Sequence, residues 1–130
     1  MEIVLDTSVV IALLAGDEEK KMIADAIDGN DLVCPESIKP EIGNAVSAMF
    51  KRGRITLKQG IELTEKFQKL KVEIVPLNLK RAAEISHKYN IYAYDAYILE
   101  CSERLKSDLA TLDSRMKEVA EDLGISIVEV

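Results

Sequence analysis

The stretch EIVLDTSVVIALLAG, residues 2–16, decides the fold class of this chain of 130 residues. Its first part, EIVLD at 2–6, is almost continuously apolar and predicts a buried strand. The part that follows predicts a short helix, which Gly16 is suited to end because glycine readily adopts the left-handed conformation found after helices. A buried strand that passes directly into a helix is typical of a parallel sheet covered by helices.

Short apolar strands and helices alternate along the rest of the chain. Further strands are predicted at residues 31–35, 72–76, 108–113 and 125–130. Helices are predicted at residues 18–29, 40–53, 57–70, 79–90, 91–106 and 114–124. Pro40 suits a first helical turn, and Thr56 and Asn78 suit the N-caps of the two helices that follow them. We therefore expect an α/β fold, a single domain over residues 1–130 with a central parallel sheet of about five strands and helices on both faces.

Composition is that of a folded, soluble protein. Hydrophobic residues make up 48% of the chain and charged residues 31%, a balance that disordered chains lack. The apolar N-terminal run carries Glu2 and Asp6 and no basic leader, so it does not predict a signal peptide. No segment approaches the roughly 20 uninterrupted apolar residues that a membrane span needs. We expect a cytoplasmic protein that does not engage a membrane.

The cysteines and the single histidine do not form a recognisable site. Cys34 and Cys101 are far apart in sequence, and only His87 accompanies them, so neither a zinc site nor a redox pair is indicated. The two cysteines are expected to be small buried side chains. His87 lies on a predicted helix and is expected to be structural or exposed.

The formal net charge of −6 argues against nucleic-acid binding through a broad basic surface. It does not argue against a nuclease. Divalent cations held by a cluster of acidic residues bridge to phosphate and reverse the sign of the local charge.

Asp95 lies in the apolar and aromatic run IYAYDAYILE, residues 91–100. On a helix, the residues three and four positions away share its face. They are Ile91, Tyr92, Ile98 and Leu99. None of them is a cation, and an unpaired carboxylate away from water costs several kcal/mol. Asp95 is therefore expected to be exposed, paired with a distant residue or bound to a metal ion.

Three other acids are candidates to meet Asp95. Asp6 and Asp113 end predicted strands, and the carboxyl ends of parallel strands share the edge at which such sheets bind ligands. Each also suits an ordinary N-cap, and Glu41 suits a first helical turn through the helix dipole. If the four acids converge, their repulsion requires a cation between them, and oxygen-rich clusters suit Mg²⁺ or Mn²⁺.

Four segments resemble, in order and spacing, the motifs of the PIN-domain ribonucleases. The segments are LDTSVVIALL, PEIGNAV, YDAYILECSERL and LATLDSRM. The resemblance extends over essentially the whole chain, so it implies a single PIN-like nuclease domain, and it is nearest to the VapC-type toxins of prokaryotic toxin–antitoxin pairs. The catalytic and metal-binding acids that it implies are Asp6, Glu41, Asp95 and Asp113.

The resemblance also implies an activity and partners. The activity is hydrolysis of RNA phosphodiester bonds, with Mg²⁺ or Mn²⁺ activating a bound water. Thr7, Ser8 and Thr111 match hydroxyl positions that orient the acids and the metal-bound water. The implied partners are an RNA substrate, a second copy of the chain in a homodimer, and a small VapB-like antitoxin.

Several cations and tyrosines are candidates to hold RNA. The run KRGR places Lys51, Arg52 and Arg54 together, where they can contact phosphates or form an ordinary solvated surface. The cations elsewhere are Lys80, Arg81, Lys88, Arg104 and Arg115. The tyrosines near Asp95 are Tyr89, Tyr92, Tyr94 and Tyr97, which can stack on bases or serve as core or dimer contacts.

Other functions fit less well or remain alternatives. A phosphatase with an aspartyl nucleophile requires a second Asp two residues after the first, where this chain has Ser8. A receiver domain requires a paired acidic motif after the first strand and a Lys after the last, and neither is present. A non-catalytic PIN scaffold that binds RNA or protein, and a stand-alone RNA-processing nuclease, remain alternatives to a toxin.

Overall fold

Apolar strands and amphipathic helices alternate in the computed structural model, which describes residues 1–16, 18 and 20–130. The strands are β1 (Glu2–Leu5), β2 (Asp31–Pro35), β3 (Glu73–Val75) and β4 (Asp108–Ala110). The helices are α1 (Thr7–Ala15), α2 (Lys20–Ile27), α3 (Ile38–Lys51), α4 (Leu57–Lys69), α5 (Leu79–Tyr89), α6 (Ala93–Leu105) and α7 (Ser114–Asp122). The expected α/β fold is confirmed.

The sheet is parallel throughout, with the strand order β3-β2-β1-β4. Val4 in β1 is in register with Val33 on one side and Leu109 on the other. All three side chains are completely buried, because β1 and its neighbours are covered by helices. Such burial on both faces explains why these strands are apolar without alternation.

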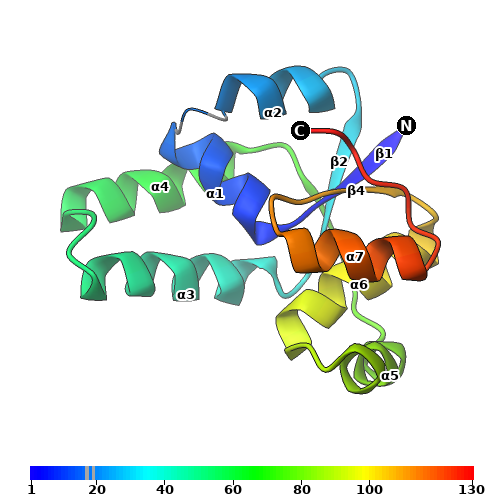
Figure 1. Cartoon of the computed structure of the whole chain (residues 1–130). Helices are drawn as coiled ribbons and strands as arrows, with labels where there is room; N and C mark the ends of the chain where they lie inside the picture. Colours follow the sequence, from blue (N-terminus) through cyan, green and yellow to red (C-terminus); the bar gives the residue numbers. More distant parts are fainter. Residues whose placement is uncertain (17, 19) are drawn as a thin grey trace.

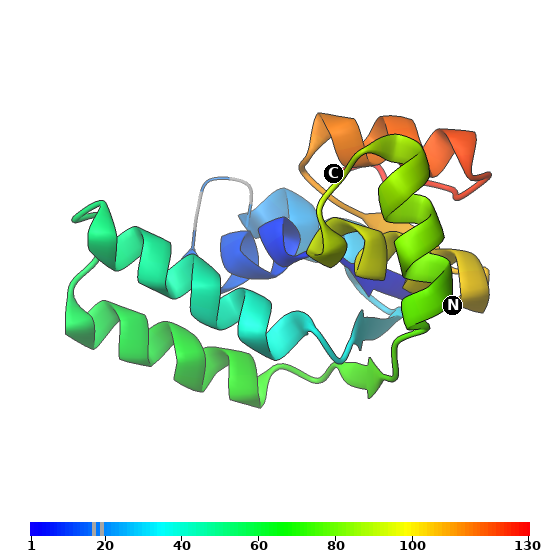
Figure 2. The same ribbon diagram turned by 90° about the horizontal axis from the view of Figure 1, so that it is seen from below.

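Helices α1–α4 gather on one side of the sheet and α5–α7 on the other (Figure 1), a separation that is also seen from below (Figure 2). Successive side chains of a strand point to opposite faces. Leu5 therefore packs in the core that includes residues of α1–α4, whereas Val4 packs in the core that includes residues of α5–α7. Two hydrophobic layers result, one on each face of β1.

The prediction of a fifth strand at residues 125–130 is wrong. In the described residues the sheet has four strands, and the C-terminal segment contributes only an isolated parallel bridge between Ile127 and Leu109. The backbone amides of Leu109 and Val128 make the bonds of this bridge. Strand β4 is only three residues long, so it offers too little edge for a further strand to extend along it.

Several predicted boundaries shift by a few residues. Helix α3 begins at Ile38, before Pro40, and α6 begins at Ala93 instead of residue 91. The predicted helix at 18–29 is shorter in the structure, and position 19 lies outside the described residues. Strands β3 and β4 are also shorter than predicted.

The predicted caps are confirmed. Thr56 forms a reciprocal capping box with Gln59, and the side chain of Asn78 accepts a hydrogen bond from the amide of Arg81. Gly16 ends α1 in the left-handed conformation, with φ of 73°. These contacts involve residues close together in the chain, so local sequence rules predict them well.

The two cysteines are buried, as expected, and are free thiols. Burial raises the pKa of both Cys34 and Cys101 to about 12, so neither is a reactive thiolate near neutral pH. Within the described part of the chain, no helix has the length and apolar character needed to cross a membrane.

A buried ion pair holds α6 against the chain that leads into α5. Glu100 is only 1% exposed and accepts a hydrogen bond from Nε of Arg104 at 2.7 Å. It also accepts one from the backbone amide of Asn78 at 3.0 Å. Arg104 in turn donates to the carbonyl oxygen of Pro76 at 2.7 Å. Glu100 therefore has its charge and its hydrogen bonds satisfied within the protein.

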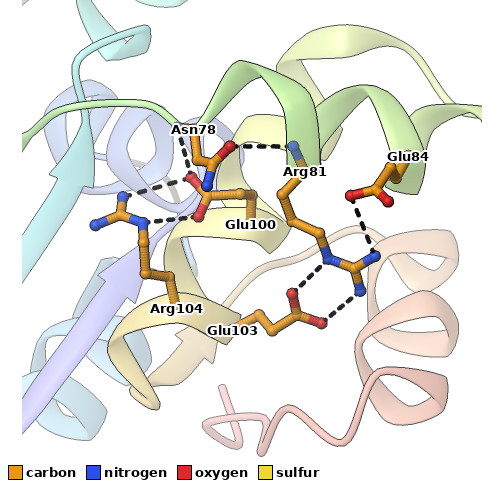
Figure 3. Close-up of polar contacts among 6 residues, drawn as sticks. All are labelled: Asn78, Arg81, Glu84, Glu100, Glu103 and Arg104. Atoms are coloured by element: carbon orange, nitrogen blue, oxygen red, sulfur yellow. Dashed lines mark hydrogen bonds and ion pairs between the residues drawn. The ribbon is translucent and has the colours of Figure 1, made fainter.

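A second, more exposed ion pair lies beside the first (Figure 3). Arg81 of α5 donates to both carboxylate oxygens of Glu103 of α6, at 2.8 and 2.9 Å, and lies 4.0 Å from Glu84. Together the two pairs fix the relative position of α5 and α6. Because Asp95 lies in the first turn of α6, the same contacts fix where Asp95 stands.

Replacing Arg104 with Met is expected to destabilise the protein by about 2–4 kcal/mol, because Glu100 would stay buried without its cation. For a chain of this size, such a loss lowers the melting temperature by roughly 10 °C. Arg115→Met is the matched control, since Arg115 and Glu118 pair at exposed positions, where a pair contributes about 1 kcal/mol or less. Thermal unfolding followed by circular dichroism measures both variants, and equal melting temperatures would contradict this prediction.

Candidate functional site

Two of the four acidic residues follow the carboxyl ends of strands, and the other two lie in the first turns of helices. Asp6 directly follows β1 and caps α1, and Asp113 follows β4 and caps α7. Glu41 lies in the first turn of α3, after β2, and Asp95 in the first turn of α6. Ligands of parallel α/β sheets bind beyond this edge.

Asp6 is almost completely buried and accepts three hydrogen bonds from neutral donors. The amide of Thr7 donates to Oδ1 at 2.7 Å. The hydroxyls of Ser8 and Thr111 both donate to Oδ2, at 3.0 and 2.6 Å. Burial raises the pKa of Asp6, the three hydrogen bonds lower it, and the charge of Asp113 raises it, with a net upward shift.

Thr7 connects Asp6 to Glu41. Its amide binds Asp6, and its hydroxyl donates to Oε1 of Glu41 at 2.8 Å. Glu41 is 7% exposed, and its Oε2 accepts a hydrogen bond from the hydroxyl of Ser37 at 3.1 Å. Burial raises the pKa of Glu41 from 4.5 to about 7, against these two hydrogen bonds and with a smaller contribution from the charges of Asp6 and Asp95.

The hydroxyls that bind Asp6 also fix the loop that carries Asp113. Thr111 accepts a hydrogen bond from the amide of Asp113 at 3.1 Å, and Ser8 accepts one from the amide of Leu112 at 3.2 Å. The side chain of Asp113 accepts a hydrogen bond from the amide of Met116. Asp6 and Asp113 are therefore N-caps and also neighbours in one hydrogen-bonded network.

Unlike Asp6 and Glu41, the side chain of Asp95 makes no hydrogen bond with any of the described residues. Its side chain is half-buried. Burial raises the pKa of Asp95, and the charges of Asp6 and Asp113 raise it further. The charge of Asp95 likewise contributes to the raised pKa of Glu41, so Asp95 is electrostatically coupled to the network around Asp6.

A model of the PIN domain matches residues 3–122 of the chain. The chain belongs to the PIN-domain family. The resemblance inferred from the four sequence segments is therefore confirmed at the level of the family. No curated protein matches the chain in sequence.

Solved structures share the fold of this PIN domain at low sequence identity. A protein from Pyrobaculum aerophilum is 19% identical with a TM-score of 0.73, and the alignment covers 92% of this chain and 79% of that one. VapBC2 from Rickettsia felis, solved bound to a DNA fragment from the promoter, is 16% identical with a TM-score of 0.69, covering 99% and 98%. VapC20 from Mycobacterium tuberculosis, a toxin that cleaves the sarcin–ricin loop, is 13% identical with a TM-score of 0.63, covering 89% and 93%.

The residues of this PIN domain fit a hard divalent cation. In the described part of the chain, no Lys, Arg or His forms an ion pair with any of the four acids. The donors that surround the acids are hydroxyls and amides, so the negative charge is not neutralised by the protein. Carboxylate oxygens are the preferred ligands of Mg²⁺ and Mn²⁺.

The acids do not form a finished cage for one ion. Among the described residues, no three Asp, Glu, His or Cys side chains are grouped closely enough to surround a single metal. Mg²⁺ usually takes only one or two carboxylates directly and keeps several waters. The arrangement therefore suits an ion whose coordination is completed by water, which is also the species that a hydrolase needs to activate.

Ser37 is the member of the network that the sequence analysis did not select. It is 5% exposed and donates to Glu41, although it is neither acidic nor part of the motif segments. The spacing of four residues between Ser37 and Glu41, with both at the start of one helix, is compatible with a contact, but it becomes a signal only once both side chains are known to be buried.

The basic run is placed away from the acids. Lys51, Arg52 and Arg54 are exposed at the end of α3 and in the turn after it. At 1.5 Å per residue, Lys51 lies about 15 Å along the helix from Glu41. The guanidinium groups of Arg81 and Arg104 are already bound to glutamates, so these two residues are less suited to phosphate than the sequence indicated.

The tyrosines near Asp95 have different environments. Tyr92 is 88% exposed at the N-cap of α6, and Tyr94 contacts Tyr97 edge to face. The hydroxyl of Tyr89 donates to Asp122, which ties α5 to α7. Tyr92 and Tyr94 are therefore the tyrosines of this group that are most accessible to a ligand.

A large cavity of this PIN domain, about 610 Å³, does not contain the acids. It lies between α5 and the start of α6 and is lined by Leu79, Ala82, Ile91 and Tyr97 among others. His87 also lines it and is exposed, as expected for a structural or surface histidine. The lining is mostly apolar, with Ser86 and Asn90 as its other polar residues, and its described residues include no carboxylate that could hold a metal ion.

Replacing Glu41 with Gln is expected to stabilise the metal-free protein at alkaline pH. A carboxyl whose pKa is raised from 4.5 to about 7 holds its proton more tightly in the folded state than in the unfolded state. The free energy of unfolding of the unsubstituted protein therefore falls as the pH rises through this interval. Glu41→Gln removes that loss, so the variant should be more stable above pH 7 by on the order of 2–3 kcal/mol.

Thermal unfolding in EDTA at about pH 5 and about pH 8 measures this effect. Gln keeps the shape of Glu, and its amide still provides a hydrogen-bond acceptor for a neighbouring hydroxyl. The stability gain of the variant should be small at the lower pH and large at the higher one. A gain that does not grow with pH would show that Glu41 is ionised without penalty in the folded protein.

Proposed function

We propose that this PIN domain is a Mg²⁺- or Mn²⁺-dependent endoribonuclease and the toxin of a VapBC-type toxin–antitoxin pair, acting in the cytoplasm. PIN domains are in general nucleases. The observation that carries the proposal is the buried network in which Thr7 binds both Asp6 and Glu41 while no described cation pairs with either acid. A site of concentrated, unneutralised carboxylate charge is suited to a metal ion that contacts phosphate.

In this proposal Asp6, Glu41, Asp95 and Asp113 would hold the metal with their carboxylate oxygens, either directly or through the water molecules that the ion keeps. When bound, the ion lowers the pKa of a water ligand and neutralises charge on the phosphate. Asp6 keeps a fixed orientation because Thr111, Ser8 and Thr7 each donate to it. The carboxylates are thus positioned before the substrate arrives. Polar groups that are preorganised in this way increase the rate of the chemical step, because they need not reorient during the reaction.

Two groups of exposed residues are the proposed RNA contacts. Lys51, Arg52 and Arg54 form an exposed basic run that suits phosphates several nucleotides from the scissile bond. Tyr92 and Tyr94, which are exposed next to Asp95, suit stacking on unpaired bases. Such contacts favour single-stranded or looped RNA, in which bases are free to stack.

Purified protein incubated with a fluorescently labelled single-stranded RNA tests the nuclease proposal. We expect cleavage with Mg²⁺ or Mn²⁺ and little cleavage of a DNA strand of the same sequence. Absence of cleavage across a set of structured and unstructured RNAs would favour the alternative of a non-catalytic PIN scaffold that binds RNA or protein.

The toxin assignment is supported by similarity to structures of VapBC2 and of the toxin VapC20. We propose two partners, a second copy of this chain in a homodimer and a small VapB-like antitoxin. The physical motive for the antitoxin is that carboxylates without a cation are complementary to an inserted Arg, which binds them through charge-assisted hydrogen bonds.

The purified chain is expected to have the mass of a dimer in light scattering at tens of micromolar. In a second experiment, co-expression of the chain with the product of a small neighbouring gene should yield a complex without nuclease activity. Addition of excess RNA to that complex should produce no cleavage until the partner is removed. A monomeric mass would contradict the dimer. A fully active protein that captures no small partner would favour a stand-alone RNA-processing nuclease.

A further inference from the structure

Ser37 and Glu41 form a contact that differs from ordinary helix capping. Ser37 is the N-cap residue of α3, but its side chain makes no cap hydrogen bond, and its backbone is helical, with φ of −68° and ψ of −11°. A serine at this position normally accepts a hydrogen bond from the amide of the second or third helical residue. Here the third helical residue is Pro40, which has no amide hydrogen.

The hydroxyl of Ser37 instead donates to Oε2 of Glu41 at 3.1 Å. The other oxygen of Glu41 is taken by Thr7 at 2.8 Å. The carboxylate is therefore held from two sides, by a residue of α1 and by a residue at the start of its own helix. Both Ser37 and Glu41 are buried, with 5% and 7% of their surface exposed, so water does not readily replace the serine hydroxyl.

We infer that Ser37 is a positioning residue that orients the carboxylate of Glu41 toward the proposed metal ion. This inference rests on the proposed function, since it assumes that Glu41 is a metal ligand. Groups that hydrogen-bond to metal ligands fix their orientation, and their loss typically weakens metal binding or activity by about 10–100-fold. Without the hydroxyl, one oxygen of Glu41 is left without a partner, and the side chain is free to leave the orientation that the ion requires.

The test is the affinity for Mn²⁺ measured by isothermal titration calorimetry on the whole chain, without RNA. Ser37→Ala is expected to weaken binding by about 10–100-fold. Ser37→Thr keeps a hydroxyl and should restore most of the affinity. Ser47→Ala is the matched control, because Ser47 lies on the same helix, is exposed and makes no described side-chain hydrogen bond.

A double-mutant cycle separates positioning from a general effect on the helix. In a Glu41→Gln background, Ser37→Ala should cause no further loss of Mn²⁺ affinity, because the group that Ser37 orients is already absent. An equal loss in both backgrounds, or an unchanged affinity of Ser37→Ala, would overturn the inference while leaving the proposed function intact. Absence of Mn²⁺ binding by the unsubstituted chain would overturn both.

Discussion

Replacing Asp95 with Asn is expected to lower the rate of RNA cleavage by at least about a hundredfold, since even groups that only support a metal ligand account for 10–100-fold. Asn has nearly the same shape as Asp but lacks the negative charge that binds a divalent cation. The side chain of Asp95 makes no hydrogen bond among the described residues, so the substitution leaves the network of Asp6, Thr7 and Glu41 in place. The rate of cleavage of a labelled RNA under single-turnover conditions measures the effect.

Folding of the Asp95→Asn variant should be retained. Burial and the charges of Asp6 and Asp113 raise the pKa of Asp95, so its ionised form is disfavoured in the metal-free protein, and loss of the charge should not lower the melting temperature. Asp25→Asn is the matched control, because it makes the same chemical change at an exposed position of α2. Full activity of a folded Asp95→Asn protein would remove Asp95 from the proposed site.

Removal of divalent cations with EDTA is expected to abolish RNA cleavage, and addition of Mg²⁺ or Mn²⁺ in excess should restore it. The reason is that the acids supply negative charge but no described Lys, Arg or His pairs with them to neutralise a phosphate. In the absence of the ion, the carboxylates repel the substrate. The rate of RNA cleavage in EDTA should therefore fall to the detection limit of the assay.

The cleavage assay must exclude contaminating ribonucleases, because many of them need no metal. Asp95→Asn protein, expressed and purified in parallel, provides that control, because a contaminant would be present equally in both preparations. Cleavage that persists in EDTA with the unsubstituted protein, but is absent with Asp95→Asn, would contradict metal dependence and point to a different role for the acid. Circular dichroism in EDTA should show that the fold itself does not require the ion.

The sequence by itself determined the class of fold and the local features of its elements. The apolar run at residues 2–6 predicted β1, and Thr56 and Asn78 predicted the starts of α4 and α5. These features depend on periodicity and on contacts between residues a few positions apart, so they can be read along the chain. Asp6, Glu41, Asp95 and Asp113 were selected as the acids that the resemblance to the PIN-domain ribonucleases implies. The strand-end positions of Asp6 and Asp113, and the absence of a cation on the helix face of Asp95, supported the choice.

Only the tertiary structure decided how the site is held together. The contacts of Thr111 with Asp6 and of Thr7 with Glu41 join residues that are distant in the chain, and no local rule predicts them. Ser37 was overlooked because its spacing to Glu41 carries meaning only when both side chains are buried.

Tertiary packing also decided which expectations were wrong. The C-terminal segment is apolar enough for a strand, but β4 is too short for it to extend along. The sequence offered Arg104 as a candidate cation for RNA. In the structure its guanidinium group is bound to Glu100 and to the carbonyl oxygen of Pro76. The raised pKa of Glu41 likewise comes mainly from burial, which depends on how elements from the whole chain pack around one side chain. Burial and long-range contacts are properties of the packed molecule, and for that reason the sequence identified the acids while the structure alone determined their environment.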